Sequence, residues 1–201
     1  QRILFFCVGL AMGLVLVSNI LRGRAEKKLA SDTFDAGRNI PGMLVDYAQE
    51  GRPVYGDGVI YTAGGSFLFA LDAKTGKPLP GFGKDGQASV ILDVLNQRYA
   101  DVKSAISMGY WFTTAPQFYK RVIYIGSTRS ESHIPGGHVL AVDAKSGKVL
   151  WHFNTIPQDA KDQGWEIAGP TWVGGERNGG GIWETPAIDP ELGLLYVAVA
   201  N

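Results

Sequence analysis

A tryptophan and an asparagine define the chemistry that this sequence suggests first. Trp183 stands two residues after the glycine run 179–181, and Asn201 follows the strand-like segment 194–199. An indole offers a flat apolar face, and a side-chain amide oxygen is a ligand for hard cations. The pair therefore suits a planar cofactor bound together with a metal ion.

The composition favours a β-rich globular chain. The 201 residues carry no formal net charge and are 45% hydrophobic, so the chain can bury a core but lacks the basic excess that attracts nucleic acid. Its 27 glycines and 10 prolines are typical of short strands joined by tight turns. Cys7 is the only cysteine, which excludes an internal disulfide and a cysteine-based zinc or haem motif.

The N-terminal segment is apolar. Residues 3–21 carry no charge, and a helix of this length, at about 1.5 Å per residue, nearly spans a bilayer core of about 30 Å. We expect a transmembrane or signal-like helix at residues 1–22, with a membrane anchor favoured over a secretory signal or a buried helix. A polar linker should follow at residues 23–50.

The charges around this segment and the ends of the chain bear on topology. Four basic residues follow the apolar run and only Arg2 precedes it, so the positive-inside rule taken alone leaves the rest of the chain in the cytoplasm. The chain starts at Gln1 and stops in mid-strand, so we expect a piece of a longer protein, in which upstream helices could overrule this orientation.

From residue 51 onward an internal repeat organises short predicted strands. The segment 70–77, Ala-Leu-Asp-Ala-Lys-Thr-Gly-Lys, recurs at 141–148 as Ala-Val-Asp-Ala-Lys-Ser-Gly-Lys, and a weaker copy starts at Ala187. In each copy a strand leads into an Asp-x-x-x-Gly turn, which predicts a hairpin. No amphipathic helix of comparable strength is expected in this part of the chain.

The spacing of the repeats predicts the architecture. The turn residues Asp72, Asp143 and Asp189 are 71 and 46 residues apart, and a four-stranded propeller blade needs about 40 to 50 residues. We predict an all-β fold of about three propeller blades, with an insertion in the first blade at residues 80–110. A β-sandwich is the alternative.

The second repeat carries a longer motif. Its pattern is Ala141-x-Asp143-x-x-Ser146-Gly147-x-x-x-Trp151. This pattern resembles the tryptophan-docking motif of eight-bladed quinoprotein propellers, and with the glycine run and its tryptophan it makes residues 51–201 resemble the pyrroloquinoline quinone (PQQ)-dependent alcohol and sugar dehydrogenases. The resemblance implies that this part of the chain is a fragment of an eight-bladed β-propeller.

The resemblance also implies where PQQ binds. Trp183 matches the tryptophan that forms the floor under the quinone, and Thr113 and Thr128 match hydroxyls that contact the cofactor. Arg52 is a weaker match to a PQQ-binding arginine, because the residues around it depart from the family's order.

A metal site is implied beside the quinone. Glu131 and Asn201 match the ligands of Ca²⁺, which takes hard oxygen ligands. The general base of the family is an aspartate that would lie beyond Asn201, so no catalytic residue is expected within the chain and the fragment alone should be inactive.

The implied function is oxidation of an alcohol or sugar hydroxyl, with hydride transfer to the quinone and electrons passed to ubiquinone or cytochrome c. The implied location is the bacterial inner membrane, with the propeller in the periplasm and no nucleic-acid partner. The alternative is a non-catalytic propeller scaffold that binds proteins in the cell envelope. Such a scaffold would keep Trp151 but has no reason to combine Glu131, Trp183 and Asn201.

Overall fold

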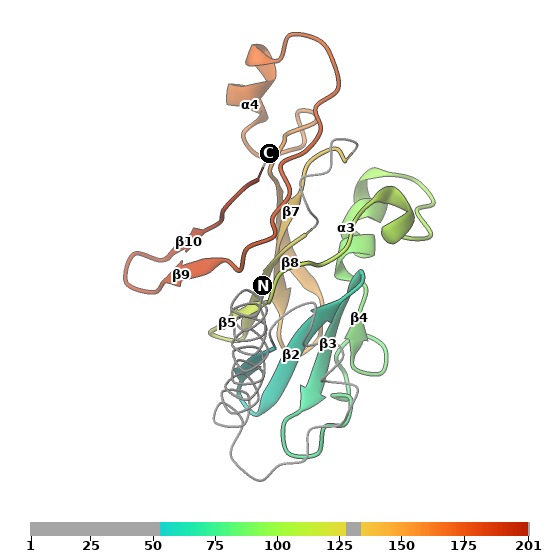
Figure 1. Ribbon diagram of the computed structural model, residues 1–201, viewed down its shortest axis with the longest axis vertical. Coiled ribbons are helices and arrows are strands. Elements are labelled where there is room, and N and C mark those ends of the chain that lie inside the picture. Colours follow the sequence, from blue (N-terminus) through green and yellow to red (C-terminus); the bar gives the residue numbers. More distant parts are fainter. Residues whose placement is uncertain (1–52, 128–133, 201) are drawn as a thin grey trace, which may run out of the picture. The chain divides into compact units, whose positions relative to one another are not determined.

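The computed structural model describes residues 53–127 and 134–200, which contain three antiparallel sheets (Figure 1). The predicted N-terminal helix and linker lie outside the described residues. Within the described ranges, no helix combines the length and the apolar character needed to cross a membrane.

The first two sheets each consist of four strands in sequential order. The strands of the first sheet are β1 (Val54–Gly56), β2 (Val59–Gly64), β3 (Phe67–Asp72) and β4 (Gln87–Ala88). Those of the second are β5 (Gln117–Tyr119), β6 (Val122–Gly126), β7 (His138–Asp143) and β8 (Val149–Asn154). The third sheet is a hairpin of β9 (Ala187–Asp189) and β10 (Leu194–Tyr196).

The repeated turns form as the sequence predicts. Asp72 Oδ1 accepts hydrogen bonds from the Thr75 hydroxyl at 2.7 Å and from the Thr75 N–H at 2.8 Å, and these bonds lower the pKa of Asp72. Asp143 Oδ1 does the same with the hydroxyl and N–H of Ser146. Each turn then ends on a glycine with positive φ, as in Gly147 at 72°.

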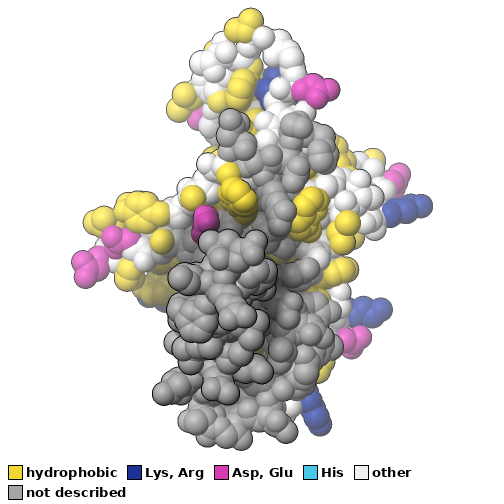
Figure 2. Space-filling model, viewed as in Figure 1, with side chains coloured by type: hydrophobic (Ala, Val, Ile, Leu, Met, Phe, Trp, Pro, Cys, Tyr) yellow, Lys and Arg dark blue, Asp and Glu magenta, His cyan; other side chains and the backbone are white. Residues whose placement is uncertain are grey.

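The third copy of the turn closes the β9–β10 hairpin. Asp189 Oδ1 accepts from the N–H groups of Glu191 and Leu192, both at 2.9 Å. Leu194 and Tyr196 on β10 are about half exposed, and Figure 2 shows apolar side chains along this hairpin at the surface.

Strand β4 of the first sheet lies inside the range 80–110 that was predicted as an insertion, so the inserted segment begins only after Ala88. This segment contains a helix that the sequence did not lead us to expect. Helix α3 (Val90–Arg98) follows β4, and a 3₁₀ turn, η1 (Ile106–Met108), follows α3. The helix buries Val90, Ile91, Val94 and Leu95. The expectation of no comparable helix was wrong because this apolar stripe is only two turns long, and a short apolar run does not distinguish a helix from a buried strand.

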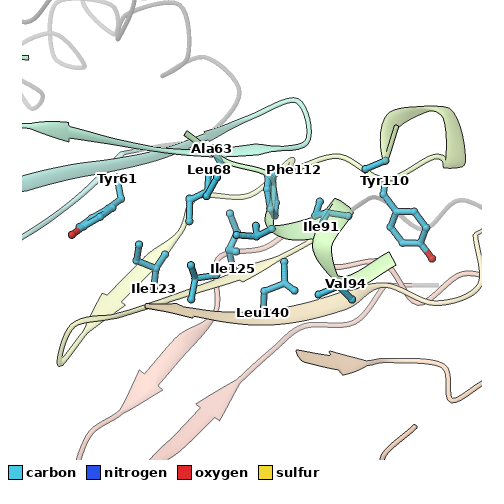
Figure 3. Close-up of a cluster of buried hydrophobic side chains, with 14 of the residues drawn as sticks. Tyr61, Ala63, Leu68, Ile91, Val94, Tyr110, Phe112, Ile123, Ile125 and Leu140 are labelled. Carbon is cyan, nitrogen blue, oxygen red and sulfur yellow. The ribbon is translucent and has the colours of Figure 1, made fainter. Parts of the chain in front are cut away.

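The core lies between the first two sheets and α3. Figure 3 shows Leu68 of β3 facing Ile125 of β6 and Leu140 of β7, with Val94 of α3 beside them. All four side chains are buried. Burial of such aliphatic side chains contributes roughly 1.5–3 kcal/mol each, so this shared core stabilises the two sheets as one unit.

Carbonyl groups of the turn between β7 and β8 accept hydrogen bonds from the first repeat. The Tyr61 hydroxyl donates to the carbonyl of Ala144 at 2.9 Å, and Gly83 N–H donates to the carbonyl of Ser146 at 2.9 Å. Burial is the main cause that raises the pKa of Tyr61 to about 12, so the hydroxyl keeps the proton that it donates. Two four-stranded sheets joined in this way are typical of neighbouring propeller blades.

Candidate cofactor site

The glycine run that precedes Trp183 is fixed by its backbone. Gly179 N–H donates to the carbonyl of Ile134 at 2.8 Å, and Ile182 N–H donates to the carbonyl of Ser127 at 3.3 Å. The carbonyl of Gly181 accepts from Ala200 N–H at 2.9 Å. The segment 179–182 therefore lies between the end of β6 and the chain that follows β10.

Glycines on both sides allow this close approach. A Cβ at Gly126 would overlap the Ile182 side chain, and a Cβ at Gly137 would lie 2.6 Å from the carbonyl oxygen of Gly180. Gly180 itself has a φ of 69°. We call this set of contacts, formed by Gly126, Gly137 and Gly180, the glycine seam.

Trp183 follows the seam and is 53% exposed as a residue. The side chain is therefore not part of the hydrophobic core, and a large part of the indole is accessible to a flat ligand. Two residues further on, the Thr185 hydroxyl lies 3.3 Å from the hydroxyl of Thr114. This contact brings the segment that contains Thr113 next to the segment that contains Trp183.

Thr113 has an unusual hydroxyl. Its Oγ1 is buried and has no hydrogen-bond partner within residues 53–127 and 134–200. A buried hydroxyl without a partner costs about 1–3 kcal/mol, and a ligand that hydrogen-bonds to it would recover this cost. Trp183, which is half exposed, and the unsatisfied hydroxyl of Thr113 lie on adjoining segments. Together they fit a planar ligand with polar edges, and PQQ is such a ligand.

Four of the predicted site residues lie outside the described residues: Arg52, Thr128, Glu131 and Asn201. Three described residues near Thr128, Glu131 and Asn201 hydrogen-bond to the segment 179–182: Ser127, Ile134 and Ala200. Ser127 and Ala200 adjoin Thr128 and Asn201, and Ile134 is three residues after Glu131. In the part of the chain that the structure describes, no group of three or more His, Cys, Asp or Glu side chains could hold a metal ion.

The sequence analysis missed Thr155 and Thr185. The Thr155 hydroxyl donates to the carbonyl of Gly180 at 2.6 Å, and Thr185 contacts Thr114 as described above. Each contact joins positions that are far apart in the sequence, 25 residues for Thr155 and 71 for Thr185. No local pattern marks residues of this kind. Thr155 only follows a predicted strand, and Thr185 only follows the glycine run and Trp183.

Comparison with known proteins identifies the family. Residues 30–201 match the family model of the PQQ glucose/ethanol/alcohol dehydrogenase β-propeller domain. The chain belongs to this family. The predicted β-propeller fold and the resemblance to quinoproteins are thereby confirmed, whereas the number of blades stays a prediction.

Relatives within the PQQ family include two enzymes of Pseudomonas putida. Quinohemoprotein alcohol dehydrogenase ADH-IIG is 31% identical over 199 residues, covering 78% of this chain and 28% of the relative. Quinohemoprotein alcohol dehydrogenase ADH IIB is 32% identical over 164 residues, covering 78% of this chain and 21% of the relative. The chain thus spans about a quarter of the length of these relatives.

Solved structures agree with the PQQ propeller fold. The structure of quinohemoprotein alcohol dehydrogenase ADHIIG from Pseudomonas putida HK5 is 34% identical, with a TM-score of 0.54, and the match covers 74% of this chain and 20% of that one. A europium-containing methanol dehydrogenase shares the fold, with a TM-score of 0.55 and 24% identity. That match covers 75% of this chain and 26% of the methanol dehydrogenase chain.

Proposed function

We propose that the protein containing this chain is a PQQ-dependent dehydrogenase that oxidises an alcohol or sugar hydroxyl, and that residues 51–201 supply part of its cofactor site. The observation that carries the proposal is the set of backbone contacts that ties Ser127, Ile134 and Ala200 to residues 179–182, directly before Trp183. These three residues lie close in the sequence to the proposed site residues Thr128, Glu131 and Asn201. Membership of the PQQ family supports the cofactor.

PQQ would bind with one face on Trp183. The half-exposed indole supports this role because stacking on a flat apolar face fixes the plane of a ring. The unsatisfied hydroxyl of Thr113 supports a polar contact to the cofactor edge. Thr128 and Arg52 complete the proposed set of PQQ contacts.

Ca²⁺ would bind between Glu131 and Asn201. The carboxylate and the amide oxygen are hard ligands of the kind that Ca²⁺ takes, and cofactor oxygens and water would complete its coordination. Ser127, four residues before Glu131, and Ala200, directly before Asn201, hydrogen-bond to the consecutive residues Ile182 and Gly181. This arrangement supports placing the two ligands on one site.

PQQ, polarised by the cation when bound, supplies the electrophilic carbon that accepts hydride from the substrate. The residues of this chain bind and orient that cofactor. A general base must take the hydroxyl proton of the substrate, and we assign it to an aspartate of the propeller outside residues 1–201. We further propose an eight-bladed ring, an inner-membrane location through the N-terminal segment with a periplasmic propeller, and ubiquinone or cytochrome c as acceptor.

The test is calorimetric titration of the full-length protein with PQQ in the presence of Ca²⁺. We expect one bound PQQ, lost after chelation of the cation. Trp183→Ala should weaken binding by at least tenfold, because the stacked indole face is lost, and Trp172→Ala should not, since Trp172 is an exposed tryptophan of the loop between β8 and β9.

Absence of PQQ binding by the wild-type protein would overturn the dehydrogenase proposal. Equal binding by wild type and Trp183→Ala would remove the indole from the site. The first result would favour the scaffold alternative, for which the exposed apolar side chains of β8 and the β9–β10 hairpin offer contact area: Leu150, Trp151, Phe153, Leu194 and Tyr196.

A further inference from the structure

We infer that Thr155 is a positioning residue, which clamps the glycine run onto the second sheet and thereby sets the position of Trp183. The inference rests on the proposed function, because Trp183 matters only where a cofactor stacks on it. Thr155 directly follows β8 and lies 28 residues before Trp183 in the sequence, so its influence on Trp183 must pass through the fold.

The hydrogen bonds of Thr155 assign the direction of its hydroxyl. Thr155 N–H donates to the carbonyl of Gly137 at 2.9 Å, and Thr155 Oγ1 accepts from Gly137 N–H at 3.0 Å. The hydroxyl lies 3.2 Å from the carbonyl of Gly137, which already accepts from Thr155 N–H, but only 2.6 Å from the carbonyl of Gly180. The single hydroxyl proton thus belongs to the bond with Gly180.

This geometry makes the hydroxyl a bridge across the glycine seam. It accepts from Gly137, at the start of β7, and donates to Gly180, so the two glycines are held through one oxygen atom. A Cβ at Gly180 would lie 2.7 Å from Thr155 Oγ1 and 2.8 Å from Ile156 Cγ1. Only a bare backbone can approach Thr155 this closely, which explains the need for glycine at position 180.

The clamp acts on Trp183 because the side chain has little packing of its own. Trp183 is 53% exposed, and the position of its indole is therefore set mainly by the backbone that leads into it. Gly179, Gly181 and Ile182 each make one hydrogen bond to another segment, and Gly180 is held by Thr155. Removal of the Thr155 hydroxyl would leave Gly180, in the middle of residues 179–182, without this hydrogen bond.

The experiment compares three variants of the full-length protein. Thr155→Val keeps the shape of the side chain and removes the hydroxyl, whereas Thr155→Ser keeps the hydroxyl. Thr171→Val is the matched control, since the Thr171 hydroxyl donates to the carbonyl of Ala168 at 2.7 Å in the exposed part of the same loop. We would measure amide hydrogen exchange of the peptide containing residues 179–183 without cofactor, and calorimetric titration with PQQ and Ca²⁺.

Thr155→Val should speed exchange of this peptide and weaken PQQ binding, each by about tenfold, the value of one lost hydrogen bond. Thr155→Ser and Thr171→Val should both behave like the wild type. Unchanged exchange in Thr155→Val would overturn the inference, as would equal defects in Thr155→Ser, which would assign the effect to packing alone.

The two proposals fail in different ways. A wild-type protein that does not bind PQQ contradicts the dehydrogenase, and the exchange data then decide whether Thr155 clamps the glycine run. Faster exchange in Thr155→Val with unchanged PQQ affinity contradicts the positioning role and leaves the dehydrogenase standing.

Discussion

Thr113 presents a buried hydroxyl that finds no partner among the described residues, and this predicts effects of opposite sign on stability and on binding. Thr113→Val should leave the unfolding free energy of the cofactor-free protein unchanged or raise it by about 1 kcal/mol, because an unsatisfied polar group disappears. The same change should weaken PQQ binding by about tenfold, because a hydrogen bond to the cofactor is lost. Denaturant unfolding and calorimetric titration measure the two effects.

Thr114 provides the control for this substitution. Its hydroxyl is buried but lies 3.3 Å from both the Ala115 carbonyl and the Thr185 hydroxyl, so Thr114→Val should destabilise the protein. If Thr113→Val destabilised the cofactor-free protein as much as Thr114→Val, the hydroxyl of Thr113 would have a partner of its own within the protein.

At the scale of elements, we predict that helix α3 of the insertion contributes to the stability of the core. Leu95 is 1% exposed and packs in the shared core, so Leu95→Ala should lower the unfolding free energy by about 2–5 kcal/mol through lost burial and a residual cavity. Leu192→Ala is the control, because Leu192 is 67% exposed and should change stability by less than about 0.5 kcal/mol. Similar values for the two variants in denaturant unfolding would show that α3 contributes no core packing.

The elements also show which parts of the fold the sequence predicts. The hairpin turns at Asp72, Asp143 and Asp189 were predicted because each is made by hydrogen bonds within three residues along the chain. Helix α3 was not predicted, since its apolar positions become a helical face only when β3, β7 and β8 are there to cover them. Local turn chemistry is readable in isolation, whereas a short buried helix depends on its neighbours.

At the scale of the whole molecule, the stability of the fold should depend on pH through His138. This residue lies on β7 next to the rings of Tyr110 and His152. Burial, then the neighbouring His152, lowers its pKa to about 3, with Arg98 acting in the same direction and Asp162 opposing them. As the pH falls below about 6.5, His138 therefore becomes protonated in the unfolded chain. In the folded chain it stays neutral until the pH approaches about 3.

The sign of the effect follows from that difference. Stability from neutral His138 is fully present above about pH 6.5 and is lost as the pH falls towards 3. Between about pH 6 and 4, the wild type should lose about 1.4 kcal/mol per pH unit more than His138→Gln in denaturant unfolding. His152, whose pKa is also lowered by burial, is present in both proteins, so the difference reports His138 together with its coupling to His152. Parallel pH profiles of the two proteins would contradict a buried neutral His138.

The candidate site was predictable only where residue type and local motif coincide. Trp183 was marked by its glycine run, and the segment of Thr113 does lie beside that of Trp183 through the Thr114–Thr185 contact. The clamp by Thr155 could not be predicted, because a threonine after a strand is common and its partner Gly180 is selected by the packing of the two segments. Sequence motifs indicate candidate site residues, but the hydrogen bonds that position those residues depend on tertiary structure.

Three of the hydrogen bonds between successive repeats end on peptide carbonyls. Tyr61 donates to Ala144, Gly83 to Ser146 and Thr155 to Gly180, and in every case the acceptor is an oxygen that any amino acid carries. The side chain at Ala144 can therefore change, within the limits of available space, without loss of the hydrogen bond from Tyr61. We therefore expect substitutions at acceptor positions of this kind to reduce the sequence similarity between repeats before they disrupt the contacts between the sheets.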